Sequence, residues 1–316
     1  MSPSRKATLL VAAAYCWWGF SPVFWRELDS VAPLDQLSWR VGLGLAYLTA
    51  VWIWRRSNPL GGLTRRHVTY GTFAALMIAA NWGAFLWAVD NDQTVEAALG
   101  YFLMPLLAVA LGVGLLGERL RPLQTVALVF GAIGMLWTLT VVGSVPWVAC
   151  VLGVSFSLYG FAKKQGPWEV VDGLTFEMLV IAPVFILFLS VRGIGESHTI
   201  DGDGSLATIA LIALTGLVTV VPLLLFAAAA KKVSLTVVGL LQYLNPVLQF
   251  LVGWQLFGED VSPGRLFGFA WIWAALACVA ADEVRSKRPV DGSEPSGGQR
   301  IVRSRKGPAA KEAPMR

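Results

Sequence analysis

Charged residues are scarce in this sequence. Asp, Glu, Lys and Arg make up 14% of its 316 residues, while 56% of the residues are hydrophobic. In a typical soluble domain about 25% of the residues are charged. So much apolar surface cannot be buried in one water-soluble core. The composition therefore excludes an ordinary soluble globular protein and predicts that lipid is the main solvent.

Residues that commonly carry out catalysis or bind metals are also few. The two histidines, His67 and His198, lie in predicted loops. We interpret the three cysteines as small packing residues, because Cys16, Cys150 and Cys278 lie within apolar segments at no metal-like spacing. No Gly-rich phosphate loop or nucleophile motif precedes a predicted helix, and no acidic pair lies in the middle of an apolar segment. The sequence therefore favours a protein that is not an enzyme, and it predicts neither a cofactor nor a metal ion.

Long apolar segments are abundant. A helix needs about 20 apolar residues to cross about 30 Å of hydrocarbon. Ten segments of roughly this length predict an all-α integral membrane protein with ten transmembrane helices, with connectors too short for a separate soluble domain. The segments are 7–25, 36–54, 68–89, 95–117, 122–142, 145–163, 172–191, 205–229, 233–257 and 264–281.

One stretch of the sequence occurs twice. Residues 96–122 and 237–263 align at a constant shift of 141 with nine identities, among them Pro105 with Pro246. This similarity predicts a duplication with a first five-helix repeat at 7–142 and a second at 148–282. Because five is odd, the second copy enters the membrane from the opposite side, so the sequence predicts an inverted-topology repeat.

The basic residues alternate between the predicted loops. Of the 25 Lys and Arg residues, 21 fall on one side if the ten segments cross the membrane in turn. Because Lys and Arg mark cytoplasmic loops, we expect the cytoplasmic membrane, with the N-terminal residues 1–6 and the tail 283–316 both inside. The tail is basic and rich in Pro and Gly, so it is predicted to be disordered and suited to contact with anionic lipid.

The expected partners follow from this placement of charge. Since the basic residues set the topology, the net charge of +5 does not indicate a nucleic-acid partner. The partners we expect are membrane lipid and a small-molecule substrate, and the sequence does not define an oligomeric state.

Polar and aromatic residues recur at helical spacing inside the apolar segments. A polar group that faces lipid is costly, so these side chains are expected to face protein or a cavity. The amides have a second interpretation as hydrogen bonds between helices, and the aromatic residues as packing or membrane-interface residues. The candidate substrate-binding residues are Tyr15, Trp18, Asn81, Trp82, Tyr101, Tyr159, Gln242, Tyr243 and Asn245.

Five further residues are candidates for coupling, gating or capping. Pro105 and Pro246 each remove a backbone donor and predict a hinge or a cavity wall, with a simple packing kink as the alternative. Arg40 and Glu177 lie a few residues inside their segments, so reaching to water is the favoured interpretation. The alternatives are anion capture by Arg40 and protonation-coupled gating by Glu177. Glu118 is expected to cap the segment that follows it.

Several of these residues resemble a known family. The sequence is similar to RarD-type permeases at several runs of residues. These are Asn81-Trp82, Phe85-Leu86-Trp87-Ala88-Val89, 96–102 with Pro105, Tyr15, Trp18-Gly19, Arg40, the 116–119 helix end, 219–223 and Gln242-Tyr243. These permeases form a branch of the EamA group in the drug/metabolite transporter superfamily. The resemblance implies ten helices in the cytoplasmic membrane, both termini inside, and export of small organic molecules, and the name of the branch is tied to chloramphenicol resistance.

The sequence thus leads to one functional expectation and one alternative. We expect a secondary transporter that moves a small organic solute, a metabolite or a drug such as chloramphenicol, across the cytoplasmic membrane by alternating access, in the direction of efflux. The alternative is a non-transporting integral membrane scaffold or partner protein. The amides and phenols at the centre of the predicted helices favour the transporter, since helices that serve only as contacts need small residues there.

Overall fold

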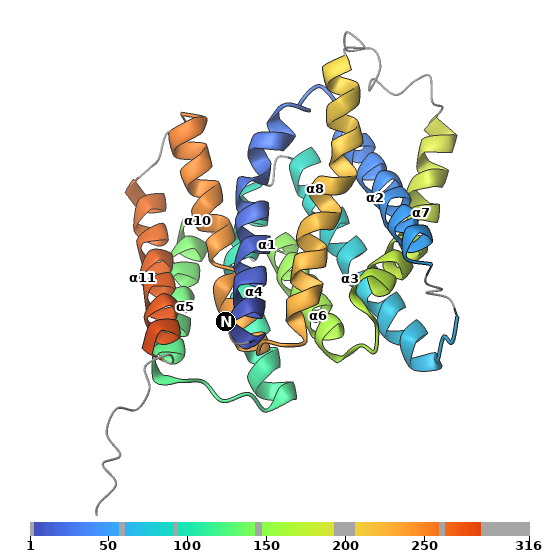
Figure 1. The fold of residues 1–316 in the computed structure, drawn as a ribbon. Helices are drawn as coiled ribbons and strands as arrows, with labels where there is room; N and C mark the ends of the chain where they lie inside the picture. The colour runs from blue at the N-terminus through green and yellow to red at the C-terminus, as the bar shows by residue number, and fades with distance from the viewer. Residues whose placement is uncertain are drawn as a thin grey trace, which may run out of the picture.

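The computed structural model describes residues 3–56, 61–91, 94–142, 147–192, 206–258 and 263–285. Within these ranges every regular element is a helix, and the helices stand side by side in one bundle (Figure 1). The predicted all-α fold class is confirmed. The predicted disordered tail lies almost entirely outside the described residues. Glu259, the counterpart of Glu118 in the second copy, is expected to cap the last segment, and it also lies outside them.

The ten predicted segments are all helical, with ends within four residues of the predicted ones. The ninth segment consists of three shorter pieces. The elements are α1 (Pro3–Arg26), α2 (Pro33–Arg55), α3 (Arg65–Asp90), α4 (Thr94–Leu116), α5 (Pro122–Val142), α6 (Trp147–Gln165), α7 (Val170–Arg192), α8 (Leu206–Ala230), α9 (Leu235–Leu241), α10 (Leu244–Leu251), the π-helix η1 (Val252–Leu256) and α11 (Pro263–Arg285).

Local sequence chemistry sets several helix ends. Proline opens α2, α5 and α11 at Pro33, Pro122 and Pro263, where its missing N–H has no intrahelical partner to lose. Gly117 and Gly258 have φ angles of 65° and 69°, the left-handed conformation that ends a helix. Both helices therefore end at a glycine, because a residue without a side chain adopts this conformation without a steric clash.

The two copies of the repeated stretch differ in helix continuity. α4 runs without interruption through Pro105, whereas Gln242 and Tyr243 separate α9 from α10 just before Pro246. Because Pro246 has no N–H, the Gln242 carbonyl accepts a hydrogen bond from the Asn245 N–H instead, at 3.0 Å. The break places two amide side chains at the middle of the bundle.

The contacts between helices follow the repeat. α1 packs on α8, and their counterparts α6 and α3 pack on each other. α1 also packs on α10, and their counterparts α6 and α4 pack on each other. The equivalent helices α2 and α7 form a pair, and so do the equivalent helices α5 and α11. α6 ends beside the start of α3, where the Trp168 indole N–H donates to the His67 carbonyl at 2.8 Å. Since α1 begins at this same end of the bundle, α1 and α6 run in opposite directions (Figure 1).

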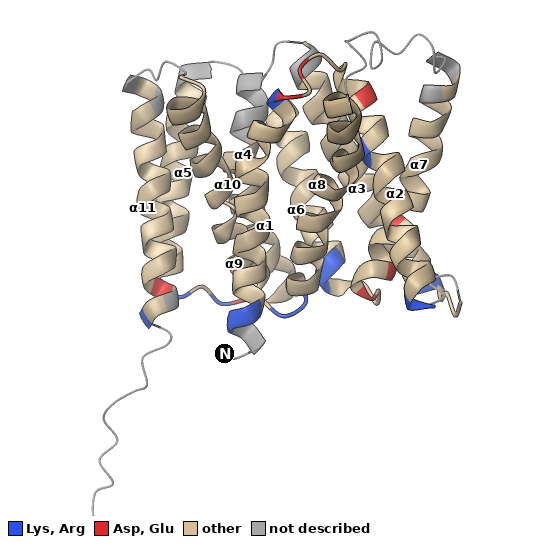
Figure 2. Cartoon of the chain, turned by 45° about the horizontal axis from the view of Figure 1, so that its top comes forward, with Lys and Arg blue, Asp and Glu red and all other residues tan. Residues whose placement is uncertain are grey.

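The outer surface of the bundle is apolar. Five described helical stretches are long and apolar enough to cross a membrane, at Arg5–Arg26, Arg65–Ala88, Val170–Phe188, Leu206–Ala230 and Leu235–Leu256, and three shorter apolar stretches accompany them. Large side chains such as Trp54, Leu76 and Leu187 are more than half exposed. Most of the coloured Lys and Arg residues lie at the end that holds the N-terminus (Figure 2). The chain is a multi-pass membrane protein.

Gly131 on α5 is a position where any side chain would collide. A Cβ atom there would lie 1.8 Å from the Tyr243 Oη. Tyr243 is fully buried and its hydroxyl has no hydrogen-bond partner. We expect Gly131→Ala to lower the free energy of unfolding by about 1–3 kcal/mol, the usual cost of overpacking, measured as a lower melting temperature in detergent.

A second substitution makes this prediction specific. Tyr243→Phe removes the hydroxyl but leaves the ring Cζ 2.6 Å from the added Cβ, so it should restore part of the stability of Gly131→Ala. Gly114→Ala on α4 is the control, because nothing lies within 4 Å of its added Cβ. A double variant that is no more stable than Gly131→Ala would contradict this view of the contact.

Candidate functional site: the central cavity

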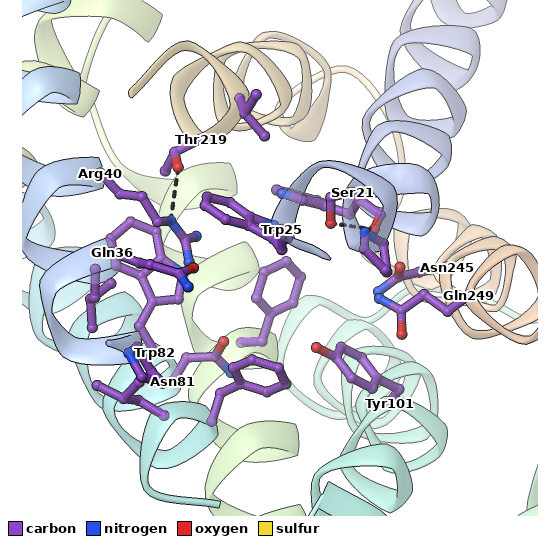
Figure 3. Close-up of a pocket in the computed structure, with 18 of the residues that line it drawn as sticks. Ser21, Trp25, Gln36, Arg40, Asn81, Trp82, Tyr101, Thr219, Asn245 and Gln249 are labelled. Atoms are coloured by element: carbon purple, nitrogen blue, oxygen red, sulfur yellow. Dashed lines mark hydrogen bonds between the residues drawn. The ribbon is translucent and has the colours of Figure 1, made fainter. Parts of the chain in front are cut away.

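A cavity of about 860 Å³ lies between α1, α2, α3, α4, α8 and α10 (Figure 3). Asp29 and Val31, in the loop between α1 and α2, line its mouth, and Met104 on α4 lies among its deeper walls. The mouth is therefore at the end of the bundle opposite the N-terminus. Seven of the nine predicted substrate-binding residues line the cavity: Tyr15, Trp18, Asn81, Trp82, Tyr101, Gln242 and Asn245.

Amide side chains supply most of the neutral polar groups in the wall. The Asn81 amide on α3 donates to the Leu152 carbonyl at 3.0 Å and to the Ser155 Oγ at 3.2 Å, both on α6. The Gln242 amide donates to the Met104 Sδ at 2.8 Å, which joins the two repeats. The Asn245 Oδ1 is buried without a hydrogen-bond partner. Burying an amide oxygen without a partner costs free energy, and a hydrogen-bond donor would remove that cost.

Aromatic rings form one wall of the cavity. Trp18 lies 5.7 Å from Tyr15 and 5.8 Å from Phe156 between ring centroids, and Phe226 packs behind them. Edge and tilted contacts of this kind hold rings in fixed orientations. A flat apolar solute would find a rigid surface here.

Arg40 is the charged residue deepest in the cavity wall. Its Nε donates to the Thr219 Oγ1 on α8 at 3.0 Å. Its guanidinium carbon lies 4.5 Å from the centroid of the Trp25 ring and 5.2 Å from that of Trp82. Gln36, one turn earlier on α2, donates to the Leu28 and Val31 carbonyls and so fixes the loop at the mouth.

Two predicted substrate-binding residues and both predicted prolines lie outside the lining of the cavity. Tyr159 is fully buried and donates to the Glu177 Oε2 at 3.2 Å. Tyr243 is sealed against Gly131. Pro105 lies inside α4 and Pro246 inside α10, and neither lines the cavity. In this conformation none of the four is placed to touch a solute in the cavity.

A buried ion pair closes the opposite end of the bundle. The Lys163 Nζ on α6 lies 2.6 Å from the Glu177 Oε1 on α7, and their side chains are 7% and 2% exposed. The favoured interpretation that Glu177 reaches water is therefore wrong. Its carboxylate is buried, and Lys163 stabilises the charge in place of water.

Glu118 ties the two repeats together at this same end. Its carboxylate accepts hydrogen bonds from the Leu235 N–H at 2.7 Å and from the N–H and Oγ1 of Thr236, both at 2.8 Å. The Lys164 Nζ lies 3.6 Å away. The prediction that Glu118 caps the next helix is wrong: it caps α9 instead.

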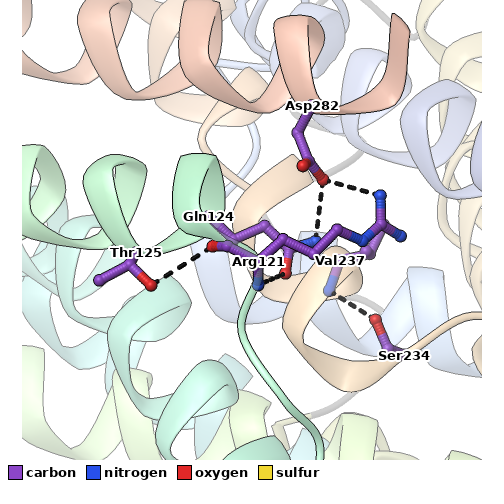
Figure 4. Close-up of polar contacts among 6 residues, drawn as sticks. All are labelled: Arg121, Gln124, Thr125, Ser234, Val237 and Asp282. Atoms are coloured by element: carbon purple, nitrogen blue, oxygen red, sulfur yellow. Dashed lines mark hydrogen bonds and ion pairs between the residues drawn. The ribbon is translucent and has the colours of Figure 1, made fainter. Parts of the chain in front are cut away.

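Gln124 caps α5 in its place (Figure 4). Its Oε1 accepts from the Arg121 N–H at 3.0 Å, and its amide donates to Asp282 on α11 at 3.1 Å. The Arg121 guanidinium also pairs with Asp282, at 3.0 Å. The cap of α5 thus belongs to a network that holds α5 against α11, which frees Glu118 to reach across the repeats.

The Glu118 contacts lead to a prediction about the closed end. Glu118→Ala removes three hydrogen bonds from the first turn of α9, so that turn should open more often. We expect amide hydrogen exchange in residues 234–238 to speed up about tenfold, the effect of losing about 1.4 kcal/mol. Glu169→Ala, an exposed change at the same end, is the control. Unchanged protection of this turn in Glu118→Ala would refute the role of the cap.

Trp25 and Gln36 are cavity residues that sequence reasoning missed. Both lie near the ends of their predicted segments, where tryptophan is typical of the membrane interface. The spacing of Gln36 and Arg40 by four residues, which places both on one face of α2, is the signal that could have found the second of them.

A multi-pass helical protein with a central polar cavity that opens at one end has the form of a membrane transporter. The chain belongs to the EamA-like transporter family, whose match covers residues 5–140 and 144–281. Within that family it is a RarD-type permease, as the resemblance in the sequence predicted.

Two relatives and one solved structure illustrate this membership. The chain is 37% identical over 297 residues to "Protein RarD" of Streptomyces exfoliatus, across 90% of this chain and 91% of the relative. It is 33% identical over 291 residues to "Uncharacterized transporter YojE" of Bacillus subtilis, across 90% and 97%. A solved structure titled "Crystal structure of protein" shares the fold, with a TM-score of 0.65 and 20% identity over 87% of this chain and 97% of the other.

Proposed function

We propose that this permease is a secondary transporter that moves a small organic solute across the cytoplasmic membrane by alternating access, in the direction of efflux. The observation that carries the proposal is the central cavity, open at one end and closed at the other by the pair of Lys163 and Glu177. Its volume of about 860 Å³ lies within the range of small-molecule sites, about 300–1,000 Å³. A metabolite or a drug such as chloramphenicol would fit.

The symmetry of the helix contacts supports alternating access. If the two halves are inverted repeats, exchanging their conformations would close the present mouth and open the opposite end. The difference between the continuous α4 and the broken α9 and α10 agrees with this, because two copies in different conformations are what one state of such a cycle requires.

The charge distribution supports an orientation. The connection from α2 to α3 lies at the end that holds the N-terminus (Figure 2). Four arginines flank it: Arg55, Arg56, Arg65 and Arg66. By the positive-inside rule that end faces the cytoplasm, so the present cavity opens outward.

A scaffold protein, the alternative function, would need no hollow centre walled with amides. Since no nucleotide-binding motif occurs in the sequence, an ion or solute gradient is the energy source in this proposal.

Flux through purified protein tests the proposal. Proteoliposomes would be loaded with amino acids, other small metabolites or chloramphenicol in turn, with and without a pH gradient, and the efflux of each measured. We expect carrier-dependent efflux of at least one solute, saturable with concentration. No flux above empty vesicles for any of them would favour the scaffold.

A further inference from the structure

Arg40 carries a positive charge that the described protein does not neutralise. No carboxylate of the described residues lies within 4.0 Å of its guanidinium, and its one hydrogen bond there runs from Nε to Thr219. A cation on a membrane helix is costly and is usually paired or functional. Asp29, the one acidic residue among the described residues of the lining, is exposed at the mouth and forms no ion pair with Arg40.

The contacts of Arg40 fix its orientation and leave one edge available. The Thr219 hydroxyl donates to the Thr215 carbonyl at 2.9 Å, so its oxygen is turned toward Arg40 to accept from Nε. The rings of Trp25 and Trp82 lie against the guanidinium and hold its plane. The two terminal nitrogens make no hydrogen bond with the described protein, and such a pair is the fork that binds a carboxylate or phosphate in bidentate fashion.

Apart from Asp29 at the mouth, the described lining is neutral or positive. Across the cavity from Arg40 lie Asn245, Gln249 and Tyr101, whose side chains are polar but carry no formal charge (Figure 3). Arg26 near the mouth stacks over the Phe257 ring at 4.2 Å and adds a second positive charge. A cationic solute would therefore meet like charge without a deep carboxylate to balance it, whereas an anionic solute would supply the missing partner.

We infer that the solute of this cavity is an organic anion, whose carboxylate or phosphate binds the terminal nitrogens of Arg40 while its flat apolar body lies against Trp18 and Phe156. Its far end carries a neutral polar group that meets Asn245 and Gln249. This inference rests on the proposed function and narrows its substrate class, because an uncharged drug would leave Arg40 unpaired in the cavity.

Matched pairs of anionic and neutral probes test the inference. The full-length protein in lipid nanodiscs would be titrated by calorimetry with phenylacetate against phenylacetamide, indole-3-acetate against indole-3-acetamide, and phenyl phosphate against phenol. We expect at least one anion to bind at least tenfold more tightly than its neutral partner, with the carboxylate and phosphate pairs showing which head group the site prefers.

Substitutions separate binding from a structural role of Arg40. Arg40→Gln should abolish the preference for the anion while leaving the neutral partner's affinity within threefold, and Arg40→Lys should retain part of the preference because it keeps the charge. Arg55→Gln, the same change at the exposed cytoplasmic end of α2, is the matched control. A merely structural Arg40 would lower the affinity for both members of a pair equally.

The outcomes separate this inference from the proposed function. If no anion shows Arg40-dependent binding, or if neutral partners bind as tightly as anions, the inference is overturned. Vesicle flux of a neutral or cationic solute that is insensitive to Arg40→Gln would overturn it as well, while the transporter proposal stands. The absence of flux for every solute, anions included, would count against both.

Discussion

Vesicles that carry Asn81→Leu or Gln242→Leu are expected to lose solute flux by about 10- to 100-fold at equal protein levels. Each substitution puts an apolar side chain of similar volume into the cavity wall. A polar solute group that faces leucine stays unpaired and loses about 1–3 kcal/mol, which is a factor of about 10–100 in the rate. Both residues are buried, at 8% and 3% exposure, and both line the cavity.

The two substitutions differ in what else they break. Asn81→Leu also removes the hydrogen bonds from α3 to Leu152 and Ser155 on α6, so its protein should melt at a lower temperature. Gln242→Leu loses only the contact with the Met104 sulfur, a weak acceptor, and its stability should change little. A loss of flux in both, with a loss of stability mainly in the first, would identify flux as a property of the cavity.

Asn91→Leu is the matched control for this experiment. Asn91 follows the same helix α3 but is exposed, and its amide donates only to the Trp87 carbonyl at 2.8 Å. Its flux should equal that of the unsubstituted protein. If Asn81→Leu and Gln242→Leu transported at the same rate as Asn91→Leu, the cavity would not be the path of the solute.

The fold could be predicted from the sequence because lipid imposes a simple rule on helices. A membrane helix must be about 20 residues long and apolar, so length and hydropathy alone defined all ten helices to within a few residues. The break between α9 and α10 could not be predicted, because Pro105 and Pro246 are the same residue at equivalent positions. The two prolines therefore do not by themselves decide which copy breaks.

The site could be predicted only in part, for a geometric reason. Helical spacing shows that Tyr15, Asn81 and Tyr159 do not face lipid, but it does not separate the wall of a cavity from a sealed interior. Tyr15 and Asn81 line the cavity, whereas Tyr159 lies in the closed end against Glu177. The distinction depends on how the helices pack against one another, which the spacing within one helix does not show.

Long-range partners were the hardest feature to predict. Glu118 binds the first turn of α9, more than 110 residues further along the chain, and nothing in the sequence around it names that partner. The start of α5, the helix end nearest to Glu118 in the sequence, is capped by Gln124 instead. The closure of the cavity at the end that holds the N-terminus therefore consists of contacts between helices that are distant in the sequence.

Breaking the pair of Lys163 and Glu177 should have the largest effect on stability of any change at the closed end. Glu177→Ala leaves the Lys163 ammonium buried at 7% exposure without its partner at 2.6 Å, and the Tyr159 hydroxyl loses its acceptor. Removing one member of a buried ion pair costs about 3–5 kcal/mol. The protein can avoid this cost by opening that end to water, so under the proposed alternating access the substitution should favour the state that is open at that end.

Thiol labelling from the cytoplasmic side would measure this shift. Ala227 on α8 lines the small space beside Lys163 and Glu177 and is buried at 6% exposure, so a cysteine placed there reports access. In Glu177→Ala its labelling by a membrane-impermeant reagent should speed up at least about tenfold, since 1.4 kcal/mol corresponds to a factor of ten. The exchanged pair Lys163→Glu with Glu177→Lys keeps both charges and should return the rate toward that of the original pair. Equal labelling rates in Glu177→Ala and the original protein would show that the ion pair does not hold this end closed.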